Sequence, residues 1–175
     1  MRFLVKARYD RESMTELHWA RRVTVSRRKN RIAHAVIWGL IALGILELLL
    51  ILLLDTWEFN SRTLQNCLMA SVLFLLLNNI DALNGWVAAR ELPAGMRETQ
   101  TLFEENGYTI QTKTAKINMS YADIIAACES QEHFFLFTEE RNGQFLPKSS
   151  FIEGTPDDFR KFITEKTGKP VEYIK

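Results

Sequence analysis

Cysteine and histidine are scarce in this chain of 175 residues, which contains 2 cysteines and 3 histidines. Cys67 lies in an apolar stretch and Cys128 in the polar C-terminal half, and neither has a Cys or His neighbour at the spacing of metal ligands. We therefore expect no disulfide, no metal site and no bound cofactor. Both thiols are interpreted as structural apolar side chains.

The sequence motifs of common enzyme classes are also missing. No Gly-rich phosphate loop, no HExxH and no GxSxG sequence occurs, and no Cys is paired with a His at a supporting spacing. His18, His34 and His133 lie in three different contexts along the chain. The chain is therefore predicted not to be an enzyme.

A long apolar segment dominates the first half of the chain. Residues 35–54 contain a single ionisable residue, Glu47. A helix of that length is roughly 30 Å long, which matches the hydrocarbon thickness of a bilayer. A helix in a soluble core rarely stays apolar on every face, and the segment begins too late and runs too long for a cleaved signal peptide. We predict a transmembrane helix.

A second, weaker span is predicted over residues 64–83, whose middle is rich in Leu, Met, Val and Phe and whose end, residues 78–81, is polar. The connection between the two apolar segments is short, and irregular backbone cannot lie exposed to lipid with its amide groups unpaired. Residues 32–88 are therefore predicted to form a two-helix transmembrane hairpin.

The distribution of charge predicts the orientation of this hairpin. Residues 1–31 contain ten Lys and Arg against three Asp and Glu, a net charge of +7. By the positive-inside rule, both termini are expected in the cytoplasm of a cell whose membrane the chain crosses twice. Trp38, Trp57 and Trp86 fall near the predicted membrane boundaries, where interfacial aromatic residues are common.

The basic residues are expected to attract anionic lipid head groups without specificity. Those predicted to lie at the membrane surface are Arg21, Arg22, Arg27, Arg28, Lys29 and Arg31. Nucleic-acid binding is not expected, because topology and lipid attraction already account for a basic segment tethered beside a bilayer.

Residues 91–175 form a small soluble domain with a net charge of −4 and a largely β pattern. Tight turns are predicted at Asn106-Gly107 and at Arg141-Asn142-Gly143. The expected strand segments are Thr99–Phe103, Tyr108–Lys113, Ala115–Tyr121, Ile124–Cys128, His133–Thr138 and Gln144–Leu146. We expect them to form one strongly bent antiparallel sheet.

A C-terminal amphipathic helix is predicted to close this sheet. Thr155 is a capping residue followed by Pro156 at the first helical position. Phe159, Phe162 and Ile163 then place an apolar stripe at helical spacing. The expected fold class is therefore membrane α+β: a two-helix hairpin plus a small antiparallel β-domain capped by a helix.

The N-terminal segment, residues 1–31, is predicted to hold a strand and a basic juxtamembrane helix. Residues 2–9 alternate between apolar and basic side chains, as a strand does. Because a lone strand needs a sheet, we expect it to pair with the edge of the C-terminal sheet. Residues 13–16 have capping-box spacing and predict the start of the helix at Ser13.

Four short motifs follow one another in the C-terminal part of the chain: Phe103-Glu104-Glu105-Asn106-Gly107-Tyr108, Ser120-Tyr121-Ala122-Asp123-Ile124, Phe134–Phe137, and Leu146-Pro147-Lys148 followed by Phe151. Together they resemble the YcxB-like family of bacterial membrane proteins. Tyr121 stands where the family often has Trp. The resemblance covers about residues 103–162 and implies a pleckstrin-homology-like (PH-like) domain, and it brings no established activity or catalytic residue.

Ionisable and polar residues inside predicted spans are functional candidates, because a bilayer disfavours them. The candidates are His34, Glu47, Ser71, Asn78, Asp81 and Asn84. If the hairpin turns near residue 59, Ser71 lies level with Glu47, and Asn84 with His34. Contacts between helices or in a homo-oligomer are one interpretation of these residues, and an ion or proton path is another.

Two functions from different classes follow. The first is a non-catalytic, membrane-anchored interaction or regulatory module that binds a protein or peptide through its cytoplasmic domain. The second is a small oligomeric transporter or channel component that uses Glu47 and Asp81. Retained function after Glu47→Gln favours the first, and loss of flux favours the second.

Overall fold

The computed structural model describes residues 1–54, 61–138 and 142–175, which form two compact units. One unit, here called the mixed unit, contains Met1–Ser26 and Asp81–Lys175. The other, called the hairpin unit, contains Arg27–Ile80. The sequence had placed the corresponding boundaries at residues 31 and 88. The mixed unit is thus built from both ends of the chain, and the hairpin unit is an insertion in it.

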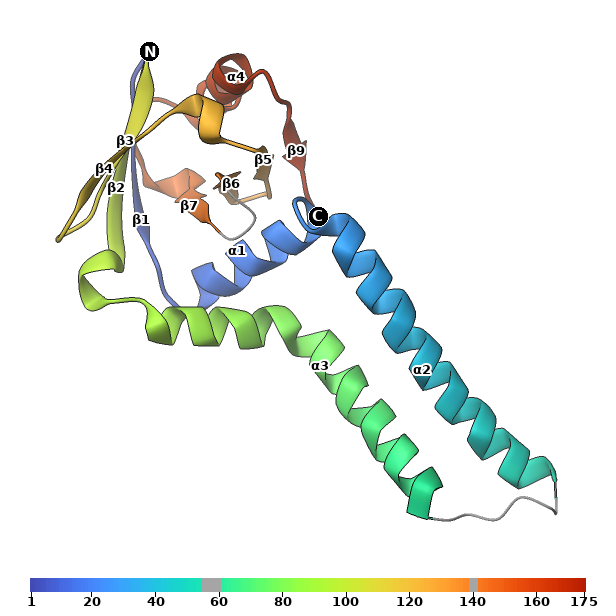
Figure 1. The fold of residues 1–175 in the computed structure, drawn as a ribbon. Coiled ribbons are helices and arrows are strands. Elements are labelled where there is room, and N and C mark those ends of the chain that lie inside the picture. The colour runs from blue at the N-terminus through green and yellow to red at the C-terminus, as the bar shows by residue number, and fades with distance from the viewer. Residues whose placement is uncertain (55–60, 139–141) are drawn as a thin grey trace. The chain divides into compact units, whose positions relative to one another are not determined.

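Two long helices dominate the middle of the chain (Figure 1): α2, Arg27–Leu53, and α3, Ser61–Glu91. Both are apolar and long enough to cross a membrane. They extend beyond the predicted spans because polar flanking residues continue each helix. Among the described residues of the hairpin unit, only Ile41 and Thr63 are buried. The connecting residues 55–60, which include Trp57, lie outside the described part of the chain.

The first sheet of the mixed unit has five strands in the order β4-β3-β2-β1-β8. The strands are β1 Phe3–Arg8, β2 Glu98–Glu104, β3 Gly107–Gln111, β4 Lys116–Met119 and β8 Phe151–Glu153. The predicted N-terminal strand exists and pairs with the C-terminal part of the chain. It does not lie at an edge, however, because β1 is antiparallel to β2 on one side and to β8 on the other.

The second sheet has four strands in the order β7-β6-β5-β9. They are β5 Ala126–Glu129, β6 His133–Phe137, β7 Gly143–Pro147 and β9 Val171–Tyr173. The β9 strand runs parallel to β5, so the expectation of a single antiparallel sheet is wrong. The sequence did not predict β8 or β9, since a strand of three residues is too short to show an alternation.

Helices α1, Arg11–Val23, and α4, Pro156–Thr167, complete the mixed unit. The helix α4 starts as predicted, with Thr155 Oγ1 accepting the Asp158 N–H at 3.2 Å, and it ends at Gly168, whose φ is 65°. The predicted start of α1 at Ser13 is wrong. Asp10 is the capping residue, because its Oδ1 accepts the Ser13 N–H at 3.0 Å and the Ser13 hydroxyl accepts the Asp10 N–H at 2.7 Å.

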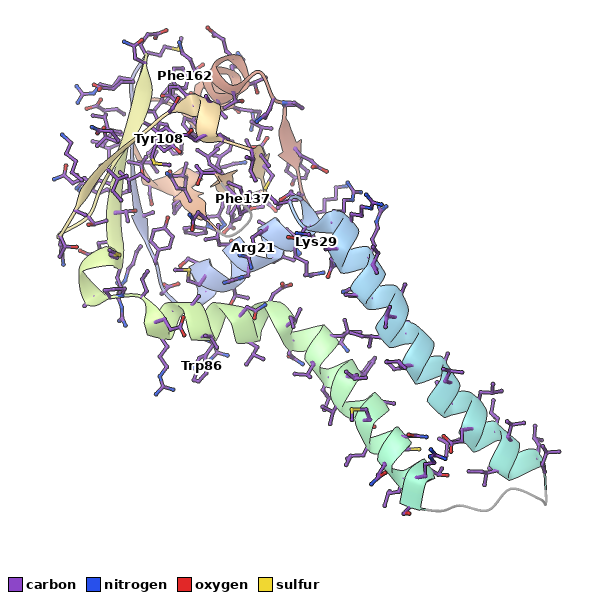
Figure 2. The ribbon with its side chains drawn as sticks, viewed as in Figure 1. Arg21, Lys29, Trp86, Tyr108, Phe137 and Phe162 are labelled. Carbon is purple, nitrogen blue, oxygen red and sulfur yellow. The ribbon has the colours of Figure 1, made fainter. Side chains whose placement is uncertain are left out.

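The core of the mixed unit consists of two apolar clusters. The larger joins the two sheets to α4, with Phe3 and Phe103 each packing edge-on against Phe159. The smaller packs α1 over the second sheet through Ala20 and Phe135. In Figure 2, Tyr108 and Phe162 lie in the region of the first cluster and Phe137 near α1. The core of the mixed unit thus includes residues from both parts of the chain, those before the hairpin unit and those after it.

The first hairpin turn differs by one residue from the predicted Asn106-Gly107. Glu104 pairs with Gly107, so Glu105 and Asn106 form the two-residue loop and Gly107 begins β3. A side chain at Gly107 would place its Cβ 2.8 Å from the Met119 carbonyl oxygen. Glycine is therefore required here for the close approach of β4 and not for a left-handed turn. Part of the second predicted turn, Arg141, lies outside the described residues.

Candidate functional site

The carboxylate of Glu47 is held by polar side chains within the hairpin unit. Asn66 Nδ2 donates to one carboxylate oxygen at 2.7 Å, and Thr63 Oγ1 donates to the other at 3.2 Å. The expected partner, Ser71, instead donates its hydroxyl to the Cys67 carbonyl oxygen at 2.8 Å. The assumed turn centre placed the pairing two turns too far along α3. Glu47 thus accepts hydrogen bonds from two neutral side chains of α3.

Asp81 belongs to the mixed unit and forms an ion pair there. Its carboxylate accepts from Arg22 of α1, with Nε at 2.8 and 3.0 Å from the two oxygens and Nη2 at 2.7 Å from one of them. Bidentate pairs of this kind are among the stronger charge-assisted contacts. Asp81 thus pairs within the mixed unit, and the expected position of Arg22 at a lipid surface stays a prediction. The pair links α1, which precedes the hairpin unit in sequence, to the end of α3, which follows it.

Gly85 explains how closely α1 and α3 cross. A Cβ at this position would lie 2.4 Å from Thr15 Oγ1 and 2.6 Å from the Thr15 Cα. No side chain fits between two backbones at that distance, so glycine is needed beside the Arg22–Asp81 pair. No local sequence pattern predicts this crossing, because Gly85 lies inside a helix and not in a turn.

The remaining polar candidates do not converge on one site. Asn78 donates its side-chain amide to the Phe74 carbonyl oxygen of its own helix at 2.9 Å. His34 belongs to the hairpin unit, and its Nε2 is buried with no hydrogen-bond partner among the described residues. Asn84 is exposed on the part of α3 that belongs to the mixed unit.

The predicted basic surface is divided between the two units. Arg21 and Arg22 lie in α1 of the mixed unit, whereas Arg27, Arg28, Lys29 and Arg31 occupy the first turns of α2. In Figure 2, Lys29 projects from the start of α2. The part of the chain that the structure describes contains no cluster of His, Cys, Asp and Glu that could hold a metal ion. Burial raises the pKa of the Cys128 thiol to about 12, which makes it a poor nucleophile.

A buried carboxylate that the sequence analysis missed organises the second sheet. Glu129 is 5% exposed and accepts from Arg160 at 2.5 and 2.9 Å, with Lys148 Nζ at 2.8 Å from its Oε2. Burial opposes its ionisation, but the hydrogen bonds from Arg160 and Lys148 outweigh burial and lower the pKa of Glu129. The sequence offered a sign of this cluster, because an acidic residue at the end of an apolar strand needs a cationic partner when it is buried.

The motif residues hold this architecture in place. The Tyr121 hydroxyl donates to the carbonyl oxygens of Glu104, at 2.6 Å, and Gly107, at 3.0 Å, and so ties the first hairpin to the segment before β5. Lys148 contributes to the Glu129 cluster, and Phe151 packs against Phe134 and Phe159. These residues are structural, because their polar atoms and rings are occupied by contacts within the chain.

An apolar cavity of about 330 Å³ opens in the mixed unit between α1, the end of α3 and the first sheet. Its walls include Met14 and Leu17 of α1, Leu92 just beyond α3, and Ile110 and Ile117 of β3 and β4. The volume is at the lower end of the roughly 300–1,000 Å³ typical of small-molecule sites. Because its walls are largely apolar, the cavity is a candidate binding site of the mixed unit.

One polar side chain of the cavity offers an unpaired hydrogen-bond donor and acceptor. Gln144 of β7 lines it and is 7% exposed, and neither its Nε2 nor its Oε1 has a hydrogen-bond partner among the described residues. Leaving a buried polar group unpaired costs about 1–3 kcal/mol. Gln144 shares a strand face with Leu146, and Phe145 on the opposite face is buried as well, so both faces of β7 are covered by the chain.

Arg21 and His18 border the same cavity. The Arg21 Nη2 lies 2.9 Å from His18 Nδ1, and burial followed by the charge of Arg21 lowers the pKa of His18. Among the described residues that line the cavity, Arg21 is the one with a permanent charge, and none is Asp or Glu. The cavity therefore combines an apolar interior, a neutral amide and a positive border.

The chain thus belongs to a class of proteins with a mixed α/β unit that is built from both ends of the chain. A two-helix apolar hairpin is inserted in the sequence of this unit. Residues 103–163 match the family model described as YcxB-like protein, which confirms the resemblance found in the motifs. The matched stretch runs from the end of β2 into α4 and leaves out β1, the hairpin unit and α1. No curated protein and no solved structure matches the chain.

Proposed function

We propose that the chain is a non-catalytic, membrane-anchored interaction or regulatory module. In this proposal α2 and α3 cross a cell membrane, and the mixed unit lies on the cytoplasmic side. The observation that carries the pairing of two crossings is the position of β1 between β2 and β8. Because β1 precedes α2 and β2 follows α3, both strands must lie on one side of the membrane. One crossing would separate them, whereas two crossings leave them together.

The exposure of the hairpin unit supports its insertion in lipid. Of the most apolar 18 residues of α2, 6% are buried, and of those of α3, 0% are buried, although both stretches are hydrophobic. In water such a surface would be far larger than the apolar patches of ordinary soluble proteins. The cytoplasmic orientation rests on the basic residues at the start of α2, in accordance with the positive-inside rule.

A PH-like fold for the mixed unit is part of the proposal. The antiparallel run β1 to β4, the second run β5 to β7 and the closing helix α4 are the features that support it. The first hairpin tip does not favour head-group capture there. Glu104 lies near Arg2, and Glu105 pairs with Lys166 and lies near the N-terminal amine, so the local cations are already engaged.

Binding rather than catalysis is supported by the surfaces of the mixed unit. Its edge strand β4 is largely exposed and could accept an added strand, and its net acidic C-terminal part suits a basic protein or peptide. The transport alternative has less support, because Asp81 is engaged by Arg22 and belongs to a different unit from Glu47. A partner protein or a second copy of the chain is the expected ligand.

Crosslinking of the intact protein in its membrane, followed by mass spectrometry, tests this proposal. Wild type is compared with Glu47→Gln and with Arg22→Gln, a variant that acts on the mixed unit. Crosslinks from the mixed unit to another protein, retained in Glu47→Gln, are expected. Crosslinks confined to the two helices of the hairpin and lost in Glu47→Gln would contradict the interaction module and support an oligomeric assembly.

A further inference from the structure

We propose that the cavity beside Gln144 binds a single-chain amphiphile with a carboxyl head group, such as a medium-chain fatty acid. This inference goes beyond the proposed function, because it needs no protein partner. It shares with that function only the anchoring in a membrane, which brings such molecules close. The proposal rests on the apolar walls, the unpaired amide and the sign of the charge at the border.

The walls select for an aliphatic chain. They include the small or aliphatic side chains of Ala88, Leu92, Ala115, Leu17 and Ile117, beside the aromatic rings of Tyr9 and Phe137. A volume of about 330 Å³ accommodates one short chain and excludes a two-chain lipid. Burial of the chain against these side chains removes apolar surface from water on both sides of the contact.

The Gln144 amide selects for the head group. Its Nε2 is a donor and its Oε1 an acceptor, and both are buried without partners among the described residues. A carboxylic acid presents one acceptor and one donor side by side and satisfies both atoms. A carboxylate satisfies the donor and is attracted by Arg21, the charged residue at the border of the cavity. An ammonium head group finds one acceptor and a repelling charge.

The position of the cavity along the chain suits a ligand that arrives from a lipid surface. Ala88 lies in the last turns of α3, on the same helix as the exposed Trp86, whose ring lies 5.5 Å from the Arg90 guanidinium. Tryptophan and basic side chains of this kind are enriched where a membrane meets water. Figure 2 shows Trp86 projecting from α3 on the side away from the two sheets.

The test uses the full-length chain in lipid nanodiscs with a decanoic acid that carries a photoreactive group on its chain. Labelled peptides are identified by mass spectrometry, and unlabelled decanoic acid, decan-1-ol and decylamine are compared as competitors. Labelling within residues 14–21 or 110–117 is expected, with decanoic acid the strongest competitor and decylamine the weakest. Gln144→Leu should lower this labelling about tenfold, as the loss of a buried hydrogen-bonded contact predicts.

Two further variants keep the test independent of folding. Ala115→Leu fills the cavity and should abolish labelling there, while Gln100→Leu makes the same type of change as Gln144→Leu on an exposed part of β2 and should leave labelling unchanged. Arg21→Gln should reduce the preference for decanoic acid over decan-1-ol. Equal labelling of wild type and Gln144→Leu, or equal competition by all three compounds, would overturn the proposal and leave a water-filled or unselective cavity.

The same experiment separates this inference from the membrane anchoring. Labelling of α2 and α3 reports contact with lipid and does not depend on the cavity. Labelled helices with an unlabelled cavity would sink the ligand proposal alone. Unlabelled helices would instead contradict the anchoring, whatever happens in the cavity.

Discussion

Large apolar side chains behave in opposite ways in the two units of the chain. Phe159 of α4 is 0% exposed and touches Phe3, Phe103 and Phe151, whereas Leu43 of α2 is 63% exposed. Both residues are typical of a hydrophobic core by composition. The mixed unit buries apolar residues against other residues of the chain, whereas most of those in the hairpin unit are exposed. Apolar content alone therefore does not identify a core. A core is identified by the residues that cover each apolar side chain.

The largest predicted effect comes from removing the strand that joins the two ends of the chain. Deletion of residues 1–9 removes β1 and exposes the partners of Phe3 and Val5, which are 1% and 0% exposed. Since truncating one buried Phe to Ala already costs about 3–5 kcal/mol, the mixed unit should unfold and lose its protease resistance. The control is Lys6→Gln with Arg8→Gln, which changes the outward face of the same strand. Unchanged protease resistance after the deletion would contradict the central position of β1.

A matched pair of substitutions tests the different surroundings of the two units. Leu43→Arg and Ile152→Arg each replace an exposed aliphatic residue, 63% and 53% exposed respectively. In a bilayer the first should reduce insertion by about 3 kcal/mol, measured as the fraction of chains inserted in a translocation assay. The second should change the thermal stability of the mixed unit by less than about 0.5 kcal/mol. Equal, small effects at both sites would show that α2 lies in water.

The carboxylates of Glu129 and Glu47 allow a second comparison of the two units, and the effect of Glu129 on stability depends on pH. Glu129→Gln should destabilise the mixed unit by about 2–3 kcal/mol, because it leaves Lys148 and Arg160 without their buried partner, with some of the cost screened at the 38% exposed Arg160. Glu47→Gln should leave the stability of the mixed unit unchanged, since Glu47 is held by neutral groups in the other unit.

The lowered pKa of Glu129 sets the direction of the pH effect. Its contribution is present above the pKa of the unfolded chain, about 4.3, and is lost as the pH falls through the lower pKa of the folded state. Acid unfolding of wild type should therefore be steeper below about pH 4.3 than that of Glu129→Gln. Parallel curves for the two proteins in urea titrations at several pH values would argue against the buried cluster.

The smallest effect concerns the cap of α1. Asp10→Ala should cost about 1 kcal/mol at neutral pH, while Asp10→Asn should cost little, because Asn caps a helix about as well as Asp. The hydrogen bond from the Ser13 backbone lowers the pKa of Asp10, so its contribution is present above about pH 3.9 and fades as the pH falls further. Chemical denaturation of the three proteins at pH 7 and pH 3 measures both effects. A loss in Asp10→Asn as large as in Asp10→Ala would place the cap elsewhere.

Several elements were predictable because their cause is local. The helix α4 follows from Thr155, Pro156 and a stripe of apolar residues within two turns. The two long helices follow from their uninterrupted composition, and the family match from ordered motifs within residues 103–163. Errors occurred where two local signals competed, as at the start of α1, where Asp10 and Ser13 both have capping side chains.

The candidate site was much less predictable, because its parts come from distant segments. Gln144 is an ordinary polar residue in the sequence, and it becomes a candidate only when β3, β4, α1 and α3 surround it. The partner of Glu47 was predicted on the basis of equal depth in an idealised hairpin, and no partner was predicted for Asp81. The observed partners, Arg22 and Asn66, depend on where the helices cross and how they are rotated.

The sequence by itself determined the apolar helices, the capped helix α4, the strand character of residues 3–8 and the resemblance to the YcxB-like family, because each depends on residues that are neighbours along the chain. The tertiary structure alone decided that β1 lies inside the first sheet, that β9 runs parallel to β5, and that Gln144 faces a cavity without a partner. These features depend on pairings between residues far apart in sequence, and no local pattern specifies which distant segment completes a hydrogen-bond ladder or closes a cavity.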